Sequence, residues 1–272
     1  MSSLNDEKRR QESFPWERSK YHTDYNSVLA HFKVASCLEH ARGDSLLDLA
    51  CGDGLITAMF ASHFRRIVGV DASSMHIAEA SRRLPAARFH ESLIEDFETD
   101  ERFDSVFLLD ILEHVVDPVS VLRKAASFLS ADGVLIAHVP NARAINRRLA
   151  VLMGALLSCE ELSPFDLHVA GHRRAYSRES LIRDVESAGL CVAASGGIFY
   201  KMLSTAQMDW FLKNGLWEEG GFGWGRVGAE KEKDWKAEFC RACYELGKEQ
   251  PEDCNIIYVC AGRSRPSALP KN

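Results

Sequence analysis

Between residues 45 and 139 the sequence alternates short apolar runs with longer amphipathic segments, and this alternation restricts the fold more than any other feature. The apolar runs have the length of strands, whereas the segments between them repeat apolar residues at the spacing of a helix face. We expect strands over Ser45–Leu49, Arg66–Asp71, Ala87–His90, Phe103–Asp110 and Gly133–Val139, with helices over Leu55–His63, Ser74–Leu84 and Val119–Leu129. Strands that alternate with helices predict an α/β fold, in which helices cover both faces of a parallel sheet.

The rest of the chain divides around this core. Residues 1–23 are polar and predict a flexible arm, and an amphipathic helix over 24–41 opens a core of residues 24–140. Residues 141–176 interrupt the alternation with a helical stretch, Ile145–Leu157, and predict a lid inserted beside the sheet. Residues 177–272 are expected to complete the sheet, with a helix over Ser177–Ala188, a tryptophan-rich helical cap over 205–250 and extended segments over Leu190–Ala194, Ile198–Met202 and Asn255–Ala261.

Composition argues against several classes of protein. The chain has 272 residues, of which 46% are hydrophobic and 26% are charged, as in ordinary globular proteins. No apolar run has the length of a membrane span, and the N-terminus lacks the apolar centre of a secretory signal, so we expect a cytoplasmic protein without membrane segments. The formal net charge of −6 disfavours a nucleic-acid partner.

The most specific motif follows the first expected strand, where Ala-Cys-Gly-Asp-Gly occupies residues 50–54 and a helix is expected to start at once. Glycines in such a turn let a ligand approach the main chain, and free amides at a helix start suit the carboxylate of an amino acid. Asp71 ends the second expected strand, where a carboxylate can accept hydrogen bonds from both hydroxyls of a ribose. The two features together predict a site for an aminoacyl nucleoside.

The stretch Asp48-Leu-Ala-Cys-Gly-Asp-Gly54 resembles the D-x-G-C-G-x-G motif of class I S-adenosylmethionine-dependent methyltransferases, with Ala50 in place of the first glycine. Residues 93–97, 109–115 and 133–141 resemble later blocks of that family in the same order. The resemblance spans about residues 24–200 and implies a Rossmann-like, seven-stranded, mostly parallel sheet with an antiparallel last strand. It also implies that S-adenosylmethionine is the cofactor, bound by Asp48, Ala50, Cys51, Gly52, Gly54, Asp71, Ala72, Ile94, Glu95 and Leu109.

Two acids and two histidines form a second candidate group. Asp110, Glu113 and His114 follow the fourth expected strand at helical spacing, which puts them on one face at the carboxyl end of the sheet. With His172, they resemble positions that can bind a magnesium-type divalent cation in ubiquinone-biosynthesis O-methyltransferases and small-RNA 2′-O-methyltransferases. The resemblance implies that all four are metal ligands and that Glu113, His114 and His172 are catalytic. Without a metal, either histidine can act as general base, or the group can simply hold its loops.

Arginines crowd the segments that flank this expected pocket. A guanidinium binds carboxylate or phosphate groups in a bidentate manner, so we expect the substrate to be bound by Arg143, Arg147 and Arg173. We also expect Asp110 to contact the substrate. The arginines indicate a small, anionic acceptor, although ordinary solvated helix faces explain the same arginines equally well.

Three functions remain open at this point. O-methylation of a small acidic metabolite is favoured. RNA 2′-O-methylation with a divalent metal is the second, and a catalytically inactive partner protein, suggested by Ala50, is the third.

Overall fold

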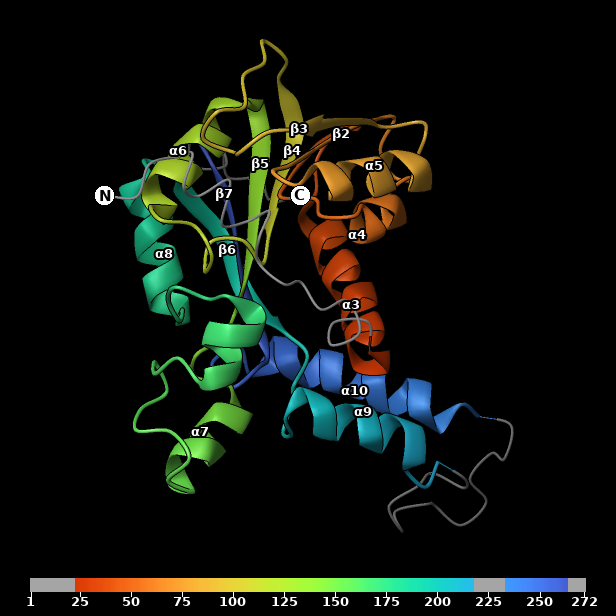
Figure 1. Ribbon diagram of the computed structural model, residues 1–272, viewed down its shortest axis with the longest axis vertical. Coiled ribbons are helices and arrows are strands. Elements are labelled where there is room, and N and C mark those ends of the chain that lie inside the picture. The colour runs from red at the N-terminus through yellow and green to blue at the C-terminus, as the bar shows by residue number, and fades with distance from the viewer. Residues whose placement is uncertain (1–22, 218–232, 264–272) are drawn as a thin grey trace, which may run out of the picture.

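The computed structural model describes residues 23–217 and 233–263, which form a seven-stranded sheet with the order β3-β2-β1-β4-β5-β7-β6 (Figure 1). The strands are β1 (Ser45–Leu49), β2 (Arg66–Asp71), β3 (Arg88–Glu91), β4 (Phe103–Leu109), β5 (Leu129–Pro140), β6 (Cys191–Ile198) and β7 (Ile256–Gly262). The first five strands pair in parallel, and β7 lies antiparallel between β5 and β6. This topology confirms the predicted mostly parallel sheet and its antiparallel last strand.

Helices cover both faces of the sheet, as the alternating sequence predicts (Figure 1). They are α3 (Asp24–His40), α4 (Leu55–Met59), α5 (Ser74–Arg83), α6 (Pro118–Ser127), α7 (Ile145–Leu152), η1 (Asp166–Ala170), α8 (Arg178–Ser187), α9 (Thr205–Asn214) and α10 (Trp235–Glu249). Leu47 of β1 packs in one apolar layer with Leu181 of α8, whereas Leu46 packs in the opposite layer with Val34 of α3. The buried strands therefore present apolar side chains to both layers.

Polar side chains cap the helices at the expected starts. Ser177 accepts a 3.3 Å hydrogen bond from the Ser180 amide, which confirms the predicted N-cap. Thr23 and Asp117 cap α3 and α6 in the same way, each at 3.1 Å.

Several element boundaries differ from the prediction. The helix expected over Ile145–Leu157 ends at Leu152, and the strand expected over Gly133–Val139 begins at Leu129. The helix expected over Leu55–His63 ends at Met59 and continues as turns, so α4 is shorter. The two extended segments expected between residues 190 and 202 are replaced by one continuous strand, β6, which contains Gly196 and Gly197. A Cβ atom on Gly197 would lie 2.5 Å from Cys254 Sγ, so the glycine permits close packing inside the strand instead of interrupting it.

Four helical segments lie near the carboxyl edge of the sheet. The segment predicted as a lid contains α7 and η1, and its role as a lid stays a prediction. The predicted tryptophan-rich cap contains α9 and α10, while its residues 218–232, like most of the predicted N-terminal arm, fall outside the described residues. None of the described helices is long and apolar enough to cross a membrane.

Candidate functional site

A cavity of about 840 Å³ opens at the carboxyl ends of the parallel strands. Residues directly after β1, β2, β4 and β5 line it, together with side chains from α3, η1 and the β6–α9 connection. We call one part the loop side (Ala50, Asp71, Ala72, Ile94, Glu95) and another the histidine side (Glu113, His114, His172). Lys33, Asp110 and Lys201 line the cavity as well. Carboxyl ends of strands are where open α/β sheets bind ligands.

On the loop side, the tips of β1 and β2 meet. The Gly52 amide donates a 3.0 Å hydrogen bond to Asp71 Oδ2, and the Ser73 amide donates a 2.9 Å bond to Asp71 Oδ1. Ala50 has a φ of 63°, a left-handed conformation that glycine adopts more easily, so the loop keeps the sharp turn despite the substitution. The convergence that the sequence predicts for these two tips is therefore present.

Half of the residues expected to bind cofactor do not line the cavity: Asp48, Cys51, Gly52, Gly54 and Leu109. Asp48 lies behind the loop, where it accepts a 2.6 Å hydrogen bond from the Thr57 hydroxyl. Burial, reinforced by the charge of Asp71, raises the pKa of Asp48 to about 7, although the bond from Thr57 opposes the shift. Asp48 thus supports the start of α4 from inside the core.

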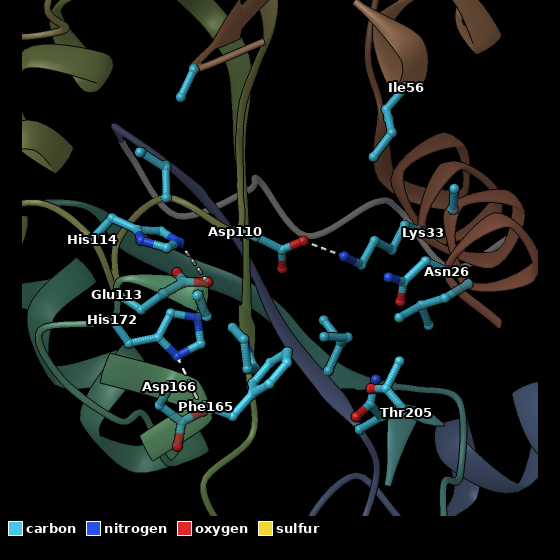
Figure 2. Close-up of a pocket in the computed structure, with 18 of the residues that line it drawn as sticks. Asn26, Lys33, Ile56, Asp110, Glu113, His114, Phe165, Asp166, His172 and Thr205 are labelled. Atoms are coloured by element: carbon cyan, nitrogen blue, oxygen red, sulfur yellow. Dashed lines mark hydrogen bonds and ion pairs between the residues drawn. The ribbon is translucent and has the colours of Figure 1, made fainter. Parts of the chain in front are cut away.

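On the histidine side, Glu113, His114 and His172 converge (Figure 2). One ligand atom from each lies within 4.8 Å of the others, as a shared cation requires. The two imidazole rings lie 5.0 Å apart between centroids. The structure therefore brings together three of the four residues predicted as metal ligands.

Each imidazole is oriented through its Nδ1 atom. His114 Nδ1 lies 3.3 Å from the Gly171 carbonyl oxygen, and His172 Nδ1 lies 3.5 Å from Asp166 Oδ1. Nε2 of His114 faces Glu113 Oε1 at 3.9 Å. Burial, reinforced by the neighbouring His172, lowers the pKa of His114 to about 4, which keeps its ring neutral near pH 7.

Glu113 is buried with no hydrogen-bond partner for either carboxylate oxygen among the described residues. Burial, together with the charge of Asp110, raises the pKa of Glu113 well above its usual value. Buried carboxylates are normally hydrogen-bonded, paired or bound to a metal, so this orphaned group indicates a missing cationic or donor partner.

Asp110 does not join this group. Its φ of 55° turns the chain at the end of β4, and its side chain forms an ion pair with Lys33 of α3 (Figure 2). Sequence reasoning missed Lys33, whose side chain is 10% exposed, and Lys201, which is 6% exposed and also lines the cavity.

The arginines predicted to bind substrate are occupied elsewhere. Arg143 lies within 4.0 Å of Glu160 and Glu179, and Arg173 donates from Nε to the His114 carbonyl; neither lines the cavity. Arg147 does line it, but its guanidinium donates a 2.9 Å bond to Asp166 and further bonds to main-chain carbonyls. The contacts of Arg147 join α7 to η1 and to the segment between them.

Comparisons with known proteins agree with this geometry. Residues 21–195 match a family model described as a methyltransferase domain. The ubiquinone biosynthesis O-methyltransferase of Methylobacterium sp. (strain 4-46) is 29% identical over 198 residues, which cover 66% of this chain and 77% of that protein. Its counterpart from Bradyrhizobium sp. (strain ORS 278) is 34% identical over 115 residues, which cover 40% of this chain and only 44% of that protein.

Solved structures share the fold at low sequence identity. Magnesium protoporphyrin IX methyltransferase from Synechocystis PCC 6803 superposes with a TM-score of 0.56 at 14% identity, covering 96% of this chain and 100% of that chain. An S-adenosylmethionine-dependent methyltransferase from Clostridium acetobutylicum superposes with a TM-score of 0.52 at 14% identity, covering 93% of this chain and 98% of that chain. With the family match over more than half of the chain, these findings show that the protein belongs to the class I S-adenosylmethionine-dependent methyltransferases.

Proposed function

We propose that the protein methylates a hydroxyl oxygen of a small, anionic acceptor. The observation that carries this proposal is the convergence of Glu113, His114 and His172 in the same cavity that reaches the meeting strand tips of β1 and β2. Methyl transfer requires an acceptor oxygen aligned with the methyl group and relieved of its proton. Groups that hold or deprotonate a hydroxyl must therefore lie near the cofactor, and the shared cavity supports such an arrangement.

The loop side is the proposed cofactor site. S-adenosylmethionine supplies an electrophilic methyl group on its sulfonium. Asp71 would accept hydrogen bonds from the ribose hydroxyls, chiefly at Oδ2, which retains acceptor capacity beyond the Gly52 amide. Its Oδ1 already faces both the Ser73 amide and, at 3.3 Å, His76 Nδ1. Ala50 and Ala72 would line the nucleoside, and Ile94 with Glu95 would lie against the adenine.

The histidine side is the proposed site of a divalent cation. The orphaned carboxylate of Glu113 and two imidazoles fit such an ion, because one ligand atom from each of the three residues lies within 4.8 Å of the others. The contacts at Nδ1 of His114 and His172 would orient both rings toward it. Two nitrogens and one carboxylate suit Mn²⁺ or Zn²⁺ better than Mg²⁺, which prefers oxygen ligands. Such an ion lowers the pKa of a bound hydroxyl.

Without a cation, His172 has the geometry of a general base instead. The Asp166 carboxylate faces its Nδ1 and would stabilise the imidazolium formed when Nε2 takes the acceptor proton. Burial alone would raise the pKa of Asp166, but hydrogen bonds with His172 and Arg147 lower it far below its usual value. Asp166 therefore stays ionised behind the ring at any pH at which the enzyme would work.

Calorimetric titration with Mn²⁺ and atomic emission after dialysis test the cation site. Wild type should bind about one ion, whereas Glu113→Gln should lose binding by about tenfold or more because the only anionic ligand is removed. Glu160→Gln, which removes an exposed acid outside the cavity, is the matched control. Equal Mn²⁺ binding by wild type and Glu113→Gln would contradict the site and leave His172 as a metal-free base.

Acceptor assays test the rest of the proposal. Formation of S-adenosylhomocysteine (SAH) should be supported by small hydroxylated carboxylates and not by RNA. Methylation of RNA that weakens steeply with added salt would favour the second function inferred from the sequence. Failure of the protein to bind SAH in calorimetry would favour an inactive partner.

A further inference from the structure

Lys201 is a buried cation inside the cavity. It follows β6, is 6% exposed and lines the cavity. Its Nζ donates a 3.1 Å hydrogen bond to the Thr205 hydroxyl and lies 4.9 Å from the centre of the Tyr25 ring. Within the described part of the chain, no carboxylate lies at ion-pair distance from this ammonium group. A buried ammonium without a counter-ion is costly, so it indicates a charged partner that the chain itself does not supply.

The other cations of this region are already neutralised. Lys33 pairs with Asp110, and Arg147 pairs with Asp166 at 2.9 Å. Lys201 is thus the lysine or arginine without a carboxylate at ion-pair distance among the described residues that line the cavity, and one positive charge calls for one negative charge. Burial, with repulsion from Lys33 and Arg147, lowers the pKa of Lys201 to about 8, although the more distant charge of Asp166 opposes the shift. The group therefore stays largely protonated at neutral pH.

The backbone next to Lys201 is strained. Phe199 has a φ of 65°, which is unfavourable for a bulky side chain. The conformation is held by a 2.7 Å bond from the Tyr200 amide to the Cys243 carbonyl and a 2.8 Å bond from the Asn255 amide to the Phe199 carbonyl. This turn ends β6 and leads the chain to the cavity, where Lys201 lies. Strain of this kind is typical of functional sites.

Lys201 lies at some distance from the proposed chemistry. Figure 2 shows Thr205, the hydrogen-bond partner of Lys201, across the cavity from Glu113 and His172. A molecule that offers a hydroxyl to Glu113, His114 and His172 can therefore extend a second group toward Lys201. We propose that Lys201 binds a carboxylate of the methyl acceptor, and this assignment rests on the proposed function of the cavity.

A carboxylate fits better than a phosphate monoester. A single uncompensated ammonium with one neighbouring hydroxyl balances a monoanion, whereas a dianionic phosphate normally requires several donors or a guanidinium fork. The arginines that would supply such a fork are engaged with protein groups. Lys201 is therefore assigned as a specificity-determining residue, and the hydroxyl to be methylated lies at the opposite end of the acceptor.

Calorimetric titration of the SAH-loaded protein with acetate, benzoate and inorganic phosphate at low ionic strength tests the assignment. Wild type should bind acetate and benzoate saturably and phosphate more weakly. Lys201→Met should weaken benzoate binding about tenfold or more, and Lys201→Arg should retain most of it because the charge is kept. Lys213→Met, which removes an exposed lysine of α9, should bind benzoate as wild type does.

The affinity for SAH separates the two proposals. It should be equal in wild type, Lys201→Met and Lys213→Met, which also shows that the variants are folded. Equal benzoate affinity in wild type and Lys201→Met, stronger binding of phosphate than of benzoate, or no binding of either carboxylate by wild type would overturn the role of Lys201. Absence of SAH binding by wild type would instead contradict the cofactor site.

Discussion

Lys33 and Asp110 form an ion pair in the cavity although 77 residues separate them in the chain. Lys33 belongs to the first described helix, α3, and Asp110 directly follows β4. The pair therefore joins the N-terminal helix to the strand end that precedes Glu113 and His114. The side chain of Asp110 is 29% exposed, so the pair lies between the core and the solvent of the cavity.

Lys33→Met should lower the free energy of unfolding by about 1–3 kcal/mol, because it leaves the partly buried Asp110 carboxylate without its cation. Denaturant titration measures the change. Combining it with Asp110→Asn should cost less than the sum of the two single substitutions, since both remove the same interaction. Strict additivity would show that the pair contributes nothing.

Asp71→Ala should weaken SAH binding by about 1–3 kcal/mol, which is roughly tenfold or more, because the proposed ribose contact is lost. Calorimetry measures the affinity. Asp96→Ala removes an exposed acid near the same edge of the sheet and should leave binding unchanged. An Asp71 variant with wild-type affinity would rule out the ribose assignment.

The sequence predicted the sheet well because its signals are local. β1 and β2 occupy the predicted residues, since each buried strand of a parallel sheet is a continuous apolar run. The meeting of Gly52 with Asp71 was also predictable, because the carboxyl ends of adjacent parallel strands lie at one edge. The length of β6 was not predictable, because two adjacent glycines such as Gly196 and Gly197 usually interrupt a strand. In this strand they permit close packing instead.

The site was predicted only where its residues belong to motifs. Motifs of the family include Glu113, His114 and His172. They do not include Lys33, which belongs to α3, or Lys201, which lies after β6. A signal was present in both cases. Lys33 follows Leu29 by one helical turn on the apolar face of its helix, and Lys201 is a single charge within the apolar run Ile198–Leu203. A lysine within an apolar stretch is expected to be buried, and a buried lysine normally pairs with an anion or binds a ligand.

Asp48→Asn should gain stability relative to wild type as the pH rises from about 4 to 7. The pKa of Asp48 is raised to about 7 in the folded protein, against about 3.9 in an unfolded chain. Between these two pH values the folded protein keeps a proton on Asp48 that the unfolded chain has released. The free energy of unfolding of wild type therefore falls by about 1.4 kcal/mol per pH unit, whereas that of Asp48→Asn does not change through this group. Urea titrations of both proteins at pH 5, 6 and 7 measure the difference. A difference independent of pH would mean that Asp48 is ionised in the folded protein throughout.

Gly54→Ala should lower both the stability and the SAH affinity, because Gly54 has a φ of 73° and a Cβ there would lie 2.9 Å from Ala80 Cβ. The positive φ alone costs an alanine about 1 kcal/mol, and the contact with α5 adds to this cost by displacing the loop. Gly154→Ala is the matched control, because Gly154 has a φ of 72° with no atom near its added Cβ. Thermal unfolding should therefore show a smaller loss for Gly154→Ala, and calorimetry should show unchanged SAH affinity for that variant alone. Equal effects of the two substitutions on SAH binding would mean that the packing of the β1–α4 loop against α5 does not position the cofactor.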